Sequence, residues 1–197
     1  MSVLGRPRAF DREAALRAAM LVFWRKGFQA ASMNDLCEAM GIRSPSLYAA
    51  FGSKENLYAE AVDCYSADAN ALIWGRIQDG PTVRAGMQKL LLAAAKVLPG
   101  SEEQPSGCLV TFAANEQCLG AIADSSAAAR SGSLSLLREG LERAVASGEL
   151  PRSTQVERLS RFYLSVVQGM AVQARDGASE AELKHIAKTA MLAWPAA

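Results

Sequence analysis

The residues that carry most enzyme and metal chemistry are scarce in this chain. Its 197 residues include one histidine, His185, and four cysteines without a Cys-x-x-Cys pair: Cys37, Cys64, Cys108 and Cys118. Metal centres need clustered ligands, and nucleophilic triads need a base beside the nucleophile. We therefore expect no metal, no cofactor, no catalytic residue and no disulfide framework. Reduced thiols fit a cytoplasmic protein.

Charge offers a second kind of chemistry, because it is divided unevenly along the chain. Residues 1–54 hold eight basic residues against four acidic ones, a net charge of +4. The rest of the chain holds 13 basic and 16 acidic residues, a net charge of −3. Such a basic segment is typical of a nucleic-acid-binding module, although a solvated basic face without a partner has the same composition.

The composition favours a globular, helical chain. Half of the residues are hydrophobic, 21% are charged and 7% are aromatic, and alanine is abundant. There is no run of about 18 apolar residues that could cross a bilayer, and the N-terminal arginines are not followed by the apolar segment of a signal peptide. We expect an all-α cytoplasmic protein without a membrane partner.

Helix signals in the first 55 residues predict three helices. Glycines that can end a helix follow the first two, at Gly27 and Gly41. Two short helices joined by a tight glycine turn, behind a longer first helix, form a helix-turn-helix. The residues expected to start the helices are Asp11, Ser32 in a capping box with Asp35, and Ser44 followed by Pro45 in the first helical position.

The second helix of such a pair enters the major groove of DNA, and its N-terminal residues contact base edges. Leu47 must face inward, which leaves its neighbours free to meet DNA. Lys54 starts the next helix, where the helix dipole favours an anion. The candidate DNA contacts are Arg43, Ser44, Pro45, Ser46, Tyr48, Ala49 and Lys54, with Arg6 and Arg8 as an arm that reaches a minor groove or as a disordered tail.

Three motifs occur together between residues 23 and 57: Phe23-Trp24-Arg25-Lys26-Gly27-Phe28, the turn at Gly41-Ile42, and Tyr48-Ala49-Ala50-Phe51-Gly52-Ser53-Lys54. With them the stretch resembles the DNA-binding domain of the TetR family of bacterial transcriptional regulators. The resemblance implies phosphate contacts by Ser32, Tyr48 and Lys54 and base reading from Arg43 to Ala49. It also implies an all-helical remainder, a homodimer on a palindromic double-stranded operator, and release from DNA when a small molecule binds.

Together these features predict an all-α protein of about nine helices in two domains. Residues 1–55, here called the head, form the three-helix DNA-binding domain. Residues 56–197, the body, form a helical domain for effector binding and dimerisation. The two join within the fourth helix, near residues 55 to 65, without a flexible linker. The function we expect is that of a repressor with an unknown small-molecule effector.

Two apolar stripes near the C-terminus are the candidate dimer interface. Their helical spacing suits a four-helix contact between two subunits, although both stripes could pack on their own subunit instead. The candidate interface residues are Leu159, Phe162, Tyr163, Val166, Gly169 and Met170 in one stripe, and Leu183, Ile186 and Ala190 in the other.

The effector site is less well defined by the sequence, because its candidate residues are also ordinary core residues. Cys108 stands at a predicted helix start, which favours a thiolate, so a redox or electrophile sensor acting through Cys108 is an alternative function. A helical enzyme and a module that binds only protein partners are two further alternatives. The candidate lining residues are Trp74, Met87, Leu91, Cys108, Phe112 and Gln168.

Overall fold

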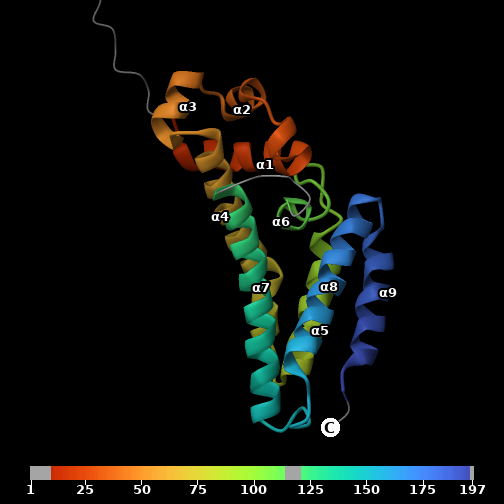
Figure 1. Cartoon of the computed structure of the whole chain (residues 1–197). Helices are drawn as coiled ribbons and strands as arrows, with labels where there is room; N and C mark the ends of the chain where they lie inside the picture. The colour runs from red at the N-terminus through yellow and green to blue at the C-terminus, as the bar shows by residue number, and fades with distance from the viewer. Residues whose placement is uncertain (1–9, 114–120, 196–197) are drawn as a thin grey trace, which may run out of the picture.

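The computed structural model describes residues 10–113 and 121–195, which form nine α-helices and no strand (Figure 1). The prediction of an all-α fold of about nine helices is confirmed. The helices are α1 Arg12–Ala30, α2 Met33–Met40, α3 Ser44–Phe51, α4 Lys54–Leu72, α5 Val83–Val97, α6 Leu109–Phe112, α7 Ala121–Ala146, α8 Val156–Arg175 and α9 Glu180–Ala190, with short 3-10 turns at Trp74–Gln78 (η1) and Met191–Ala193 (η3).

The first two helices of the head begin at the predicted caps. The Asp11 carboxylate accepts hydrogen bonds from the main-chain N–H groups of Glu13 and Ala14, both at 3.0 Å. Ser32 and Asp35 form the capping box that the sequence predicts. Gly27 breaks the regular helix with a φ of 77°, although helical turns resume to the end of α1 at Ala30.

The start of α3 differs from the sequence prediction by one residue. Ser44 is the first helical residue and does not cap the helix; the N-cap is Arg43, whose side chain makes no capping hydrogen bond. Pro45 still lies in the first turn, where its missing N–H leaves no hydrogen bond unmade.

Helix α4 runs from the head into the body, beside α7 (Figure 1). Its first half packs into the head, where Leu57, Tyr58 and Ala61 are fully buried in the same hydrophobic cluster as Phe23 and Leu47. A second hydrophobic cluster, built from η1, α5, α7, α8 and α9, fills the body. Helix α4 packs in the first cluster, and Ile73, the residue that follows it, belongs to the second, so a displacement at the end of α4 reaches both. The domain boundary at residue 55 stays a prediction.

The body is a bundle in which α5 packs against α9 and α7 against α8. The Glu149 carboxylate, after α7, accepts hydrogen bonds from the first N–H groups of α5, at Val83 (2.8 Å) and Arg84 (2.6 Å). This contact satisfies main-chain donors that a helix N-terminus leaves free. Gly86 permits close packing, because a Cβ there would collide with the carbonyl oxygen of Ile77.

Candidate functional site

The recognition helix α3 presents one face to the head and the other to solvent. Leu47 and Phe51 are buried in the head, whereas 48% of Tyr48 is exposed. Tyr48 is therefore not a core aromatic residue, and its ring and hydroxyl are free for DNA. The exposed residues are Arg43, Ser44, Pro45, Ser46, Tyr48 and Ala49, all of which the sequence proposes as DNA contacts.

Ser32 and Lys54 flank this face on neighbouring elements. The Ser32 hydroxyl oxygen accepts a hydrogen bond from the Asp35 N–H at 3.1 Å, and the hydroxyl also interacts with the Asp35 carboxylate, so a phosphate contact by Ser32 stays a prediction. The Lys54 ammonium lies 4.4 Å from the centre of the Phe28 ring. This cation–π contact holds the charge at the first turn of α4, a position that favours an anion.

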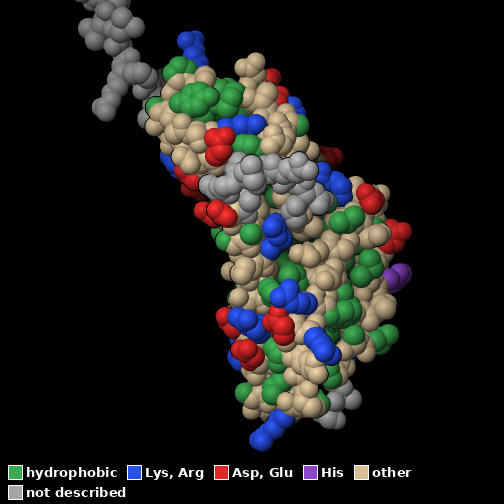
Figure 2. All heavy atoms as spheres, viewed as in Figure 1, with side chains coloured by type: hydrophobic (Ala, Val, Ile, Leu, Met, Phe, Trp, Pro, Cys, Tyr) green, Lys and Arg blue, Asp and Glu red, His purple; other side chains and the backbone are tan. Residues whose placement is uncertain are grey.

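Three of the six described basic residues of the head form ion pairs with acidic side chains. Ion pairs join Arg12 to Glu60 at 2.8 Å and Arg17 to Asp68 at 3.0 Å, each across to α4. Figure 2 shows one face of the head, where basic, acidic and apolar side chains are interspersed and form no continuous basic stripe. Part of the predicted basic surplus therefore joins α1 of the head to α4. The predicted contacts Arg6 and Arg8 lie outside the described residues.

The pair of Lys26 and Asp35 has the shortest N···O distance among the ion pairs described in the head. The two side chains meet at 2.7 Å, and Asp35 also accepts a hydrogen bond from the Ser32 N–H at 3.0 Å. The Lys26 contact, followed by the Ser32 hydrogen bonds, lowers the pKa of Asp35 from 3.8 to about 2. The Asp35 carboxylate is thus held ionised in the first turn of α2. Its ion pair with Lys26 joins α1 to α2, the first helix of the helix-turn-helix.

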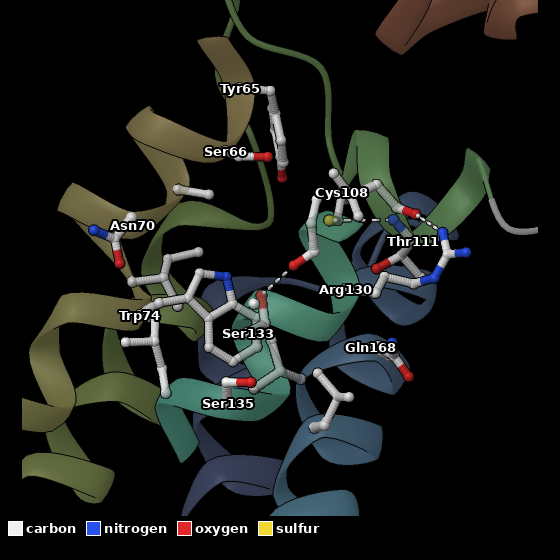
Figure 3. A pocket seen from close by; sticks show the side chains of 18 of the residues that line it. Tyr65, Ser66, Asn70, Trp74, Cys108, Thr111, Arg130, Ser133, Ser135 and Gln168 are labelled. Carbon is white, nitrogen blue, oxygen red and sulfur yellow. Dashed lines mark hydrogen bonds between the residues drawn. The ribbon is translucent and has the colours of Figure 1, made fainter. Parts of the chain in front are cut away.

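A cavity of about 440 Å³ lies in the body between α4, α6, α7 and α8 (Figure 3). Its wall combines apolar groups such as Ile73 and Val167 with neutral polar groups and the half-buried Arg130. Such a mixture suits a small amphipathic molecule, since apolar surface supplies affinity and a few polar groups fix its orientation. The polar side chains that line it are Tyr65, Ser66, Asn70, Thr111, Arg130, Ser133, Ser135, Glu139 and Gln168.

Three of the six predicted lining residues, Trp74, Cys108 and Gln168, line this cavity. Met87 and Leu91 instead lie fully buried in the hydrophobic cluster of the body. The ring of Phe112 is not in the cavity wall and packs against the guanidinium of Arg175.

The sequence analysis missed the contribution of two helices to the cavity. On α4 the lining residues Tyr65, Ser66, Ala69, Asn70 and Ile73 follow helical spacing and mix polar with apolar types, as does the α7 segment from 129 to 139. A helix face that mixes polar with apolar residues is the sequence signal that could have identified these lining residues. It differs from a core stripe, which is apolar throughout.

Tyr65 connects the cavity to the head. It lines the cavity, and its ring packs edge-to-face on Trp24 of α1 with the ring centres 4.8 Å apart. Burial, followed by the contact with Cys108, raises the pKa of the Tyr65 hydroxyl well above 10. This residue therefore stays neutral, and a molecule that displaces its ring also disturbs α1.

Cys108 is the N-cap of α6 and is half-buried. Its sulfur accepts a hydrogen bond from the Thr111 N–H at 3.4 Å. Helix α6 has only four residues, so the helix dipole at this thiol is small.

The predicted dimer residues divide into two groups. Tyr163, Met170, Leu183 and Ala190 are buried within their own subunit, so these four face the core of the body. Each stripe is therefore divided between the core of its own subunit and the surface, and which of its residues meet a partner stays a prediction. Phe162 and Gly169 are exposed, and Leu159, Val166 and Ile186 are half-buried. Two further exposed apolar residues, Val172 and Leu192, were not predicted.

In residues 10–113 and 121–195 no group of three or more His, Cys, Asp or Glu side chains is arranged to hold a metal ion. No helix in the same ranges is long and apolar enough to span a bilayer.

Known proteins share both the sequence and the fold. The family model described as bacterial regulatory proteins, tetR family, matches residues 15–61. The HTH-type transcriptional repressor ComR of Escherichia coli (strain K12) is 34% identical over 200 residues, covering 97% of this chain and 92% of ComR. The repressor BdcR of the same organism is 37% identical over 94 residues, 48% of each chain.

Among solved structures, one of a cysteine mutant of the TetR family transcriptional regulator CifR contains a 26 bp double-strand operator DNA. It matches with a TM-score of 0.90 and 42% sequence identity, covering 96% of this chain and 100% of that one. A second cysteine mutant of CifR, also complexed with 26 bp operator DNA, matches with a TM-score of 0.91 and 41% identity, covering 97% of this chain and 100% of that one.

Proposed function

The chain belongs to the TetR family of bacterial regulatory proteins and is a DNA-binding transcriptional regulator, and we propose that it is a homodimeric repressor released from its operator by a small molecule. The observation that carries the proposal is the cavity of about 440 Å³ whose wall includes Tyr65, the residue that packs on Trp24 of the head. A regulator of this kind acts where the DNA is, so we propose a cytoplasmic protein.

The exposed apolar side chains of α8, with the half-buried Ile186 of α9, support the homodimer. Phe162 is 40% exposed and Val172 43%, and a Cβ added at Gly169 meets no atom within 4 Å. A two-fold contact through this face pairs two recognition helices for two half-sites about 34 Å apart. The operator is then a palindrome, and a single subunit has too few contacts to hold it.

The cavity supports release by an effector through a shift between two conformations. Helix α4 contributes Tyr65, Ser66 and Asn70 to the cavity wall and begins in the head at Lys54. An effector that fits better when α4 is displaced favours that conformation by its difference in affinity. The same displacement changes the distance between the two recognition helices, so effector binding and operator binding oppose each other.

We favour a bound effector over chemical sensing at Cys108 because the cavity offers many neutral polar groups, whereas the thiol caps a helix of only four residues. We also propose that the chain is not an enzyme and takes no cofactor. Among the described residues that line the cavity, the charged groups are Arg130 and the exposed Glu139, and the chain's single histidine, His185, is not one of them.

The test uses fluorescence anisotropy on operator DNA selected by the full-length protein from a randomised library. A panel of small amphipathic compounds is added to the complex. We expect some of them to release the wild type but not Gly132→Leu, because Gly132 lines the cavity and a side chain there has open space to fill. Ser131→Leu, exposed on the same helix and outside the cavity wall, is the matched control and should respond like the wild type.

The proposal fails if every compound that releases the wild type also releases Gly132→Leu at the same concentration, since the effector then binds elsewhere. Release of the wild type by thiol-modifying electrophiles alone, abolished in Cys108→Ser, would support the sensor alternative instead.

A further inference from the structure

One basic side chain of the head differs from all the others that the structure describes. Arg43 makes no hydrogen bond and no ion pair with its guanidinium to any residue in the described ranges. The other described cations of the head are engaged: Arg12 with Glu60, Arg17 with Asp68, Arg25 with the Glu103 carbonyl, Lys26 with Asp35, and Lys54 with the Phe28 ring.

The main chain of Arg43 is nevertheless fixed. Its carbonyl oxygen accepts hydrogen bonds from the N–H groups of Ser46 at 2.9 Å and Leu47 at 3.1 Å, which close the first turn of α3. Leu47 is itself fully buried in the head. The side chain of Arg43 therefore extends from a fixed main chain at the N-terminal end of α3, the helix expected to enter the major groove.

The residue types on the exposed face of α3 leave few ways to read a base pair. The side chains that distinguish bases by two hydrogen bonds are Arg or Lys for guanine and Asn or Gln for adenine, and residues 44 to 51 contain none of them. The hydroxyls of Ser44 and Ser46 accept and donate, so they discriminate weakly. Pro45 and Ala49, one turn apart, offer apolar contacts that suit thymine methyl groups.

We propose that Arg43 determines the sequence specificity of the protein by donating two hydrogen bonds to the O6 and N7 atoms of one guanine in each operator half-site. Arg43 reads sequence, whereas Tyr48 and Lys54 position the head on phosphates. The inference rests on the operator binding of the family and does not depend on the effector.

The test begins with selection of half-sites from randomised duplex DNA by the full-length wild type and by Arg43→Ala. We expect a guanine at one position of each wild-type half-site and no preference at that position for Arg43→Ala. Replacing that guanine in both half-sites should weaken wild-type binding by about 5-fold to 150-fold per half-site and leave Arg43→Ala binding unchanged.

A chemical probe isolates the contact to N7. Placing 7-deazaguanine at that position removes the N7 acceptor and keeps the Watson–Crick pair. We expect weaker binding by the wild type and no further loss for Arg43→Ala. Arg43→Gln should shift the selected base from guanine towards adenine, whose N6 and N7 atoms an amide matches.

Arg43→Lys is the matched control for charge. It keeps the positive charge and hence the affinity for unrelated DNA, but it loses the planar pair of donors, so discrimination at the guanine should fall. Circular dichroism of each variant checks the fold, which should be unchanged because the exposed side chain makes no hydrogen bond and no ion pair with a described residue.

Two results would overturn the proposal. In the first, wild type and Arg43→Ala select the same bases at every position. In the second, Arg43→Ala weakens binding to specific and unrelated DNA by the same factor, which would identify Arg43 as a phosphate contact. Neither result would remove operator binding by the wild type, so both are distinct from a failure of the proposed function.

Discussion

The guanidinium of Arg175, in the last turn of α8, donates a hydrogen bond to the main-chain carbonyl of Trp24, 151 residues earlier in the chain, at a distance of 3.1 Å. The same guanidinium lies 4.3 Å from the centre of the Phe112 ring on α6. Arg175 thus connects the body to α1 of the head and to the short helix whose residues Val110 and Thr111 line the cavity. It is a second contact between cavity and head, beside Tyr65.

Arg175→Ala should loosen this junction. We expect the free energy of unfolding to fall by about 1 kcal/mol, since a charge-assisted hydrogen bond and a cation–π contact are lost at a partly solvated site. Hydrogen exchange should accelerate in the second half of α1 and in α6. Arg161→Ala, on the same helix with an exposed ion pair to Glu157, is the control and should change neither. Equal exchange rates in the two variants would refute the connection.

Lys54 and Tyr48 should be separable by the salt dependence of operator binding. Lys54→Ala removes a cation, so the slope of log affinity against log salt should fall in magnitude by about 0.9 for each phosphate lost, or about 1.8 for a dimer. Tyr48→Phe removes only a hydroxyl and should lower affinity without changing the slope. Lys89→Ala, an exposed charge in the body, controls for net charge. An unchanged slope for Lys54→Ala would remove it from the set of phosphate contacts.

The caps of the helices could be predicted from the sequence because they depend on neighbours three residues apart. The capping box of Ser32 with Asp35 forms as predicted, and Ser179 with Glu182 forms a second one at the start of α9 by the same spacing. The sequence could not show which basic residues form ion pairs, because the partners of Arg12 and Arg17 lie 48 and 51 residues away along the chain. Arg43 therefore looks like one of several cations in the sequence and stands apart only in the folded head.

The cavity and the dimer face show a second limit. Helical spacing identifies an apolar face but not the surface that covers it. The sequence therefore does not show that Met87 is a core residue and Phe162 a surface residue. Packing decides the outcome: Met87 is fully buried between helices of the body, whereas Phe162 is 40% exposed. Only the packing of α4 and α7 shows that residues with mixed polarity surround a hollow.

The stability of the head should depend on pH through Asp35. Because Lys26 and Ser32 lower its folded pKa from 3.8 to about 2, its contribution is present above the ordinary pKa and is lost as the pH falls towards 2. The difference in midpoint of denaturation between wild type and Asp35→Asn should be constant above about pH 5 and shrink between about pH 4 and pH 2. Asp63→Asn, at an exposed site on α4 without an ion pair to a described residue, should show no such trend. A difference that persists unchanged at pH 2 would contradict this assignment.

Phe162→Glu should separate dimerisation from folding. Phe162 is exposed on α8, and its ring packs edgewise on the buried Tyr163, with the ring centres 5.2 Å apart. A carboxylate there stays solvated in one subunit but is buried without a partner in the proposed interface, which is costly. We expect monomers by sedimentation equilibrium and loss of operator binding, with helical content unchanged. Leu72→Glu, on α4 and similarly exposed at 42%, should remain dimeric and bind DNA. A Phe162→Glu protein that stays dimeric would move the interface away from this face of α8.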